Sequence, residues 1–114
     1  MVTSAALSVS SVIPKPVRVV DSRVVQEVRK PYCERCGARA YGEPHHIRPR
    51  SLGGSDIREN LVQLCSDCHQ AADDGKISPY ELIAIVARRE GMDAADICRQ
   101  AGWPVPEVFL DIRL

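Results

Sequence analysis

The chain of 114 residues has few aromatic side chains, no net charge and no long apolar run. Phe, Trp and Tyr make up only 4% of the residues although 45% are hydrophobic, so the predicted core is thin and mainly aliphatic. No run approaches the roughly 18 apolar residues of a membrane-spanning helix, and no membrane partner is expected. A bound metal would usefully reinforce so small a core.

The first residues lack the marks of a secretory signal. Residues 1–13 are mildly apolar and rich in serine, but they have no basic start and no convincing cleavage site. We interpret residues 1–20, which include Pro14 and Pro16, as a flexible N-terminal arm and expect a cytoplasmic protein. Its five cysteines are then expected to be reduced, which favours metal binding over disulfide bonds.

The zero net charge hides an uneven distribution. Between Lys15 and Arg58 there are ten basic and five acidic residues, whereas the segment from Glu59 to Leu114 has five basic and ten acidic. A positive surface on the first half would suit a polyanionic substrate such as nucleic acid. On charge alone, a solvated face without a partner is an equally good interpretation.

Four of the five cysteines form two C-x2-C pairs, Cys33/Cys36 and Cys65/Cys68. This spacing lets two thiolates from one turn reach a single tetrahedral zinc ion. The 28 residues between the pairs exceed the roughly 15–20 of a zinc ribbon, so another element is inserted between the two knuckles. The alternative, a redox dithiol, ordinarily belongs to a thioredoxin-like pattern that this sequence does not have.

The three histidines lie in or next to this insert. His45 and His46 are adjacent in a segment expected to be extended, and His69 follows Cys68, where it is also an alternative zinc ligand. A neutral imidazole can act as a general base, while a divalent ion can stabilise charge on phosphoryl and leaving oxygens. Neighbouring residues of an ideal strand point to opposite faces, so the chain must bend there if both histidines serve one phosphate.

The rest of the chain predicts short strands and capped helices. Ser78 is the predicted N-cap of the clearest helix, with Pro79 at its first position and Glu81 completing a capping box. Cys98 suits a buried helix face, and the Trp103 indole is expected to pack back onto the helices. The expected strands cover residues 43–47 and 61–64, and the expected helices cover 21–30, 66–73, 79–90 and 93–100.

Together these residues resemble the signature of the HNH endonuclease family, in the zinc-containing form often found in phage and bacterial genomes. The resemblance covers about residues 33–73, roughly a third of the chain. Any fragment alone is weak, but the combination is highly specific. Besides the cysteines, it consists of Pro44 to Arg50, Gly53-Gly54, Asn60-Leu61-Val62 and the run from Leu64 to His69.

The resemblance implies a small α+β fold, a ββα-metal finger stapled by a four-cysteine zinc site, with flanking helices. The nuclease module would span residues 21–76, and a helical extension over 77–114 would serve as scaffold or partner contact. His45 and His69 match the ligands of a catalytic divalent ion, and His46 matches the general base that activates water. Asn60 matches the asparagine that braces the loop, and the products would carry a 5′-phosphate and a 3′-hydroxyl.

Three arginines, Arg48, Arg50 and Arg58, are candidates for phosphate contacts because guanidinium groups bind phosphate bidentately. Exposed charge without a specific contact is an equally good interpretation for each. DNA is the expected substrate ahead of RNA, and the working ion is left open among Mg²⁺, Mn²⁺, Ni²⁺ and Zn²⁺. The alternative function is a non-catalytic zinc module that binds nucleic acid. Any homodimer or complex with a partner protein is expected to use the C-terminal helices.

Overall fold

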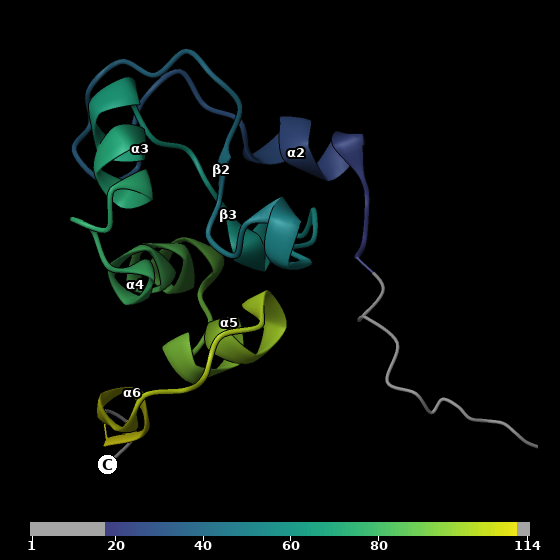
Figure 1. Ribbon diagram of the computed structural model, residues 1–114, viewed down its shortest axis with the longest axis vertical. Coiled ribbons are helices and arrows are strands. Elements are labelled where there is room, and N and C mark those ends of the chain that lie inside the picture. Colours follow the sequence, from purple (N-terminus) through teal and green to yellow (C-terminus); the bar gives the residue numbers. More distant parts are fainter. Residues whose placement is uncertain (1–17, 112–114) are drawn as a thin grey trace, which may run out of the picture.

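The computed structural model describes residues 18–111 and has a two-stranded antiparallel sheet between its helices (Figure 1). Strand β2 (His45–His46) pairs with β3 (Leu61–Val62), and His45 lies opposite Val62 while His46 lies opposite Leu61. Helix α3 (Ser66–Asp73) follows β3 and completes a ββα unit. The small α+β fold with flanking helices, expected from the sequence, is confirmed.

The connection between the two strands folds tightly back on itself. It contains two 3-10 turns, η1 (Arg50–Leu52) and η2 (Arg58–Asn60). After η1, Gly54 comes so close to the preceding chain that a Cβ there would lie 1.7 Å from the backbone oxygen of Arg48. The Gly-Gly of the sequence signature is therefore needed at Gly54 to let two backbone segments meet.

Helix α2 (Ser22–Val28) packs on the sheet from the side opposite α3 (Figure 1). Asp21 caps it by accepting a hydrogen bond from Arg23 N, as the sequence predicts, and its buried valines contact Leu61. Residues 1–17 of the expected flexible arm lie outside the described residues. Residues 18–20 are held against the strand connection, since Val19 N donates to Ser55 Oγ at 2.9 Å.

Three further helices follow, α4 (Pro79–Glu90), α5 (Ala94–Ala101) and α6 (Glu107–Asp111). Ser78 Oγ accepts a hydrogen bond from Tyr80 N, as expected of the N-cap. Glu81 does not complete the predicted capping box, because its carboxylate pairs instead with Arg35 at 2.6 Å. Helix α6 was not predicted; it is a short segment whose Phe109 is buried in the main core.

The main hydrophobic core is shared by the ββα unit and the helices that follow it. Val62 and Leu64 pack in one cluster with side chains of α4 and α5, and Cys98 is fully buried there, as predicted. Trp103 packs against the same cluster, which confirms the expected return of its indole. No helix within residues 18–111 is long and apolar enough to span a membrane.

Candidate active site

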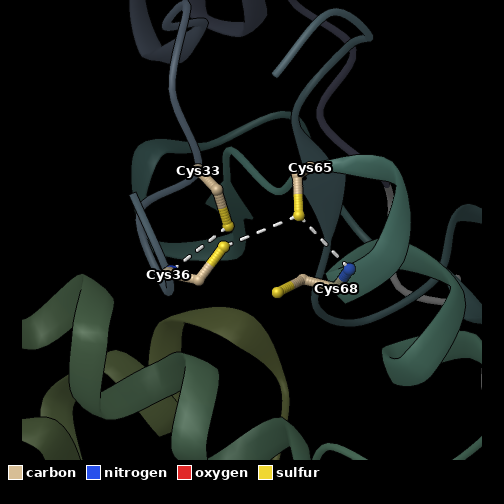
Figure 2. A group of neighbouring side chains, drawn as sticks. All are labelled: Cys33, Cys36, Cys65 and Cys68. Atoms are coloured by element: carbon tan, nitrogen blue, oxygen red, sulfur yellow. Dashed lines mark hydrogen bonds between the residues drawn. The ribbon is translucent and has the colours of Figure 1, made fainter. Parts of the chain in front are cut away.

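Four cysteine side chains converge beside α3, with sulfur atoms that all lie within 4.8 Å of one another (Figure 2). Cys33 and Cys36 come from the turn that follows α2, and Cys65 and Cys68 from the start of α3. The Cys36 and Cys65 sulfurs are 3.7 Å apart. That separation is close to the ~3.8 Å edge of a tetrahedron whose metal–sulfur bonds are about 2.3 Å long. The donor set fits a tetrahedral ion that prefers thiolates.

Backbone N–H groups donate hydrogen bonds to two of the four sulfurs, those of Cys33 and Cys65. Cys33 Sγ accepts from Arg35 N and Cys36 N at 3.4 and 3.5 Å, and Cys65 Sγ accepts from Cys68 N at 3.4 Å. Burial opposes ionisation of Cys33, but the backbone donors outweigh it and lower its pKa to about 7. Burial raises the pKa of Cys68 to about 12. Without a cation the Cys68 thiol therefore stays protonated at neutral pH, whereas a bound dication would deprotonate it.

A second cluster joins His45, His69 and Asp73, whose ligand atoms also lie within 4.8 Å of one another. The two imidazole rings meet edge to face with centroids 4.8 Å apart, and His69 Nδ1 lies 3.2 Å from Asp73 Oδ2. His69 therefore lies with His45 and not with the thiols. Burial, reinforced by the nearby His69 ring, lowers the pKa of His45 to about 4. At neutral pH this ring is uncharged, the form in which imidazole binds a metal.

Asp73 was not among the candidate metal ligands predicted from the sequence. The available signal was its position four residues after His69, which places both side chains on one face of a helix.

His46 lies on the other side of β2 from His45, as strand geometry predicts. Its Nε2 is 2.7 Å from Oδ1 of Asp56, a carboxylate that is only 3% exposed. Burial alone would raise the pKa of Asp56, but hydrogen bonds from His46 and Asp21 N, together with the charge of Arg18, lower it. Asp56 was also missed, because in sequence it is one acidic residue in a polar loop.

One open cleft, of about 850 Å³, connects the two sides of the strand. His45, His46, His69 and Asp73 all line it, so both adjacent histidines reach one cleft although they lie on opposite sides of β2. The size is in the range of ligand-binding clefts. The other side chains that line it include Tyr41, Glu43, Arg50 and Gln70.

Asn60 is fully buried beneath the strand connection and does not line this cleft. Its Oδ1 accepts from Arg48 N at 2.8 Å, and its Nδ2 donates to the backbone oxygens of Arg48 and Ser55 at 3.2 and 3.0 Å. The side chain thus ties the two ends of the connection together.

The three candidate arginines lie in different surroundings. Arg50 is exposed on η1 and lines the cleft. The Arg48 guanidinium lies over the Trp103 ring, 5.6 Å from its centroid, and its Nε donates to Leu52 O. Arg58 is turned toward α4, where it pairs with Glu90 at 3.0 Å. Of the three, the structure brings Arg50 alone to the cleft.

Comparison with known proteins shows what the segment that carries this site is similar to. Residues 33–75 match the model of the HNH endonuclease family. The chain is 42% identical over 50 residues to the type IV methyl-directed restriction enzyme EcoKMcrA of Escherichia coli, covering 36% of this chain and 18% of that enzyme. It is 59% identical over 29 residues to the probable mobile endonuclease E of Enterobacteria phage T4, covering 25% and 21%. The matches span about a fifth of each of these curated relatives.

Proposed function

Because residues 33–75 match the model of the HNH endonuclease family, we propose that the protein is a metal-dependent endonuclease that hydrolyses phosphodiester bonds in DNA. One observation carries the proposal. A candidate metal site, formed by His45, His69 and Asp73, shares its cleft with a separately held imidazole, that of His46. A module that only bound nucleic acid would not need the His46 imidazole beside the metal site.

In the proposed reaction His46 accepts a proton from the attacking water, whose oxygen forms a bond to phosphorus. The bond from phosphorus to the 3′ oxygen breaks, and that oxygen leaves with the electron pair and takes up a proton from solvent. A divalent ion held by His45, His69 and Asp73 would supply Lewis acidity at the phosphoryl and leaving oxygens. The products carry a 5′-phosphate and a 3′-hydroxyl.

Asn60 acts in this proposal as a positioning residue. Its three hydrogen bonds fix the connection between β2 and β3, which carries Asp56 and ends where the strands pair. Because its side chain is buried away from the cleft, it does not touch the substrate. It serves the reaction by holding the shape of the loop.

We assign a structural zinc ion to the four cysteines, since zinc is the usual partner of a closed four-thiolate site. The ion at the second cluster is Mg²⁺, Mn²⁺, Ni²⁺ or Zn²⁺, because a mixed set of imidazole and carboxylate donors accepts each of these. Reduced thiolates that hold zinc suit the cytoplasm, which is the location we propose.

DNA is the proposed substrate by likeness to a restriction enzyme and a probable mobile endonuclease. Arg50, exposed at the cleft, is the proposed phosphate contact. Assembly through the C-terminal helices stays a prediction. Most large apolar side chains of α4 and α5 are already buried in the chain's own core, which leaves little of them for a partner.

Plasmid cleavage by the zinc-loaded protein and its His46→Ala variant tests the proposal. Each of the four ions is added in turn, and a chelator serves as the blank. We expect nicking or linearisation by the wild type only, with fold, zinc content and DNA affinity retained in the variant. Cleavage by the variant at the wild-type rate would refute the role of His46. If the wild type binds DNA but does not cleave it with any of the ions, a non-catalytic binding module is favoured.

A further inference from the structure

Asp56 is a buried carboxylate on which three donors converge. Its Oδ1 accepts from His46 Nε2 at 2.7 Å and from Arg18 Nη2 at 2.8 Å, and its Oδ2 accepts from Asp21 N at 2.9 Å. Arg18 also donates from Nε to the backbone oxygen of Gly54. The carboxylate is therefore locked in one orientation by groups from two separate segments of the chain.

The bond to Asp56 is what fixes the orientation of the His46 ring. The His46 side chain is 11% exposed, and it makes no other hydrogen bond within residues 18–111. Neutralising a buried carboxylate does not by itself require the imidazole, because Arg18 and the Asp21 N–H already contact both oxygens. The imidazole is thus a third partner of a carboxylate whose two oxygens already have one donor each.

The direction of this bond decides which ring atom is free to react. An ionised carboxylate only accepts hydrogen bonds, so His46 Nε2 must carry a proton. In the neutral ring the lone pair then resides on Nδ1. When Nδ1 gains a proton during the reaction, the adjacent carboxylate stabilises the resulting imidazolium, as carboxylates beside catalytic histidines do elsewhere.

We propose that Asp56, itself held by Arg18, is a positioning residue for His46 and directs Nδ1 to accept the proton of the attacking water. The inference rests on the proposed nuclease function. To that function it adds Asp56 as the partner of the general base and Nδ1 as the atom of His46 that accepts the proton.

Asp56→Asn tests the proposal, with Asp21→Asn as the matched control. Asp21 is a neighbouring carboxylate that caps α2, and asparagine caps equally well. Zinc content and thermal unfolding are measured first, and steady-state cleavage follows. We expect kcat to fall roughly 10- to 100-fold in Asp56→Asn, as for other outer partners of a reactive group, with KM near the wild-type value. Asp21→Asn should match the wild type in both constants.

A second measurement does not need activity. With only three histidines in the chain, the ring protons of His46 can be assigned in the proton NMR spectrum by their loss in His46→Ala. We expect a far-downfield Nε2–H resonance, slow to exchange, in the wild type and in Asp21→Asn but not in Asp56→Asn. Absence of that resonance from the wild type, or its persistence in Asp56→Asn, would overturn the proposal.

Failure of the positioning role of Asp56 and failure of the proposed nuclease function give different results. If the wild type cleaves DNA and Asp56→Asn keeps the wild-type kcat, the positioning role is wrong and the nuclease function stands. If the wild type does not cleave, the nuclease function fails, while the NMR comparison still decides whether Asp56 holds the His46 ring.

Discussion

Arg89 on α4 donates from Nη1 to both carboxylate oxygens of Glu34, at distances of 3.1 and 3.2 Å, beside the first cysteine pair. The same guanidinium donates to the backbone oxygens of Leu61 and Arg58 at 3.0 and 2.6 Å. Glu34 in turn accepts from Gln63 N at 2.7 Å. The Arg89 side chain of α4 thus holds together the cysteine turn, strand β3 and the strand connection.

Replacing Arg89 by alanine is therefore expected to destabilise the whole fold. Both side chains of the pair are largely buried, at 14% and 6% exposure, so the change leaves Glu34 charged without its main partner. Loss of one member of such a pair costs about 3–5 kcal/mol. Chemical denaturation of the zinc-loaded protein measures the change. Arg88→Ala, an exposed neighbour on the same helix, should lie within about 0.5 kcal/mol of wild type.

Cys65→Ser is predicted to lose the zinc ion and most of the folded structure. A serine hydroxyl replaces one of four thiolates, and binding of a structural zinc ion contributes directly to the free energy of folding. Cys98→Ala is the control, because Cys98 is also buried but lies outside the thiol cluster. Metal analysis and circular dichroism should show full zinc content and a folded spectrum in the control alone. Wild-type melting of zinc-free Cys65→Ser would contradict a structural role for the ion.

Asp73→Asn should weaken the ion at the active site without disturbing the fold. The change removes one anionic donor from the cluster with His45 and His69, and fewer charged ligands mean lower cation affinity. We expect the Mn²⁺ concentration for half-maximal cleavage to rise about tenfold. Asp74→Asn serves as control, since this adjacent carboxylate bonds Gln70 outside the cluster. Equal Mn²⁺ dependence in the two variants would exclude Asp73 as a ligand.

Acid should weaken the contact between α4 and the strand connection through Glu90. Burial disfavours its charged form, but hydrogen bonds from Arg58 and Arg89 outweigh burial and lower its pKa from the ordinary 4.5. The unfolded chain then binds the proton more readily than the folded one. Ionised Glu90 thus contributes stability that is fully present above about pH 4.5 and is lost as the pH falls through the lower, folded-state pKa.

The measurement is the difference in unfolding free energy between wild type and Glu90→Gln from pH 7 down to about pH 3. Zinc release at low pH affects both proteins and cancels in this difference. The wild type should be the more stable at pH 7, and its advantage should shrink as the pH falls below about 4.5. A difference that stays constant over this range would remove Glu90 as the source of the acid sensitivity.

The sequence could predict those features that depend on local spacing. Two cysteines three positions apart fix a turn, and Asp21, Ser78 and the adjacent Pro79 mark where helices begin. The alternation of a strand likewise predicts that His45 and His46 point to different partners. Each of these inferences uses residues within one turn or one strand, where backbone geometry alone decides the outcome.

The features it missed depend on how distant segments close on one another. Asp56 becomes the partner of His46 only when the strand connection folds back beneath residues 18–21. Glu81 has the spacing of a capping box, yet Arg35, which is 46 residues away in sequence, supplies a stronger charged partner. A single polar residue in a loop carries no periodic signal that would reveal such a contact.

Alanine variants of the three candidate arginines should differ in how strongly they bind DNA and in how that affinity depends on salt. DNA affinity is measured by fluorescence anisotropy over a series of salt concentrations, in a His46→Ala background so that the duplex stays intact. Arg50→Ala should weaken binding and reduce the slope of log affinity against log salt by about one, because the exposed side chain lines the cleft. Its unfolding free energy should be unchanged.

Arg48→Ala and Arg58→Ala should behave in the opposite way. Arg48 covers the Trp103 ring and Arg58 pairs with Glu90, so their loss removes contacts within the fold. We expect both variants to unfold more easily while their salt slopes stay close to the parent value. If Arg50→Ala left the slope unchanged and either of the others lowered it, DNA would run along a different face from the cleft, and the assignment of Arg50 would be wrong.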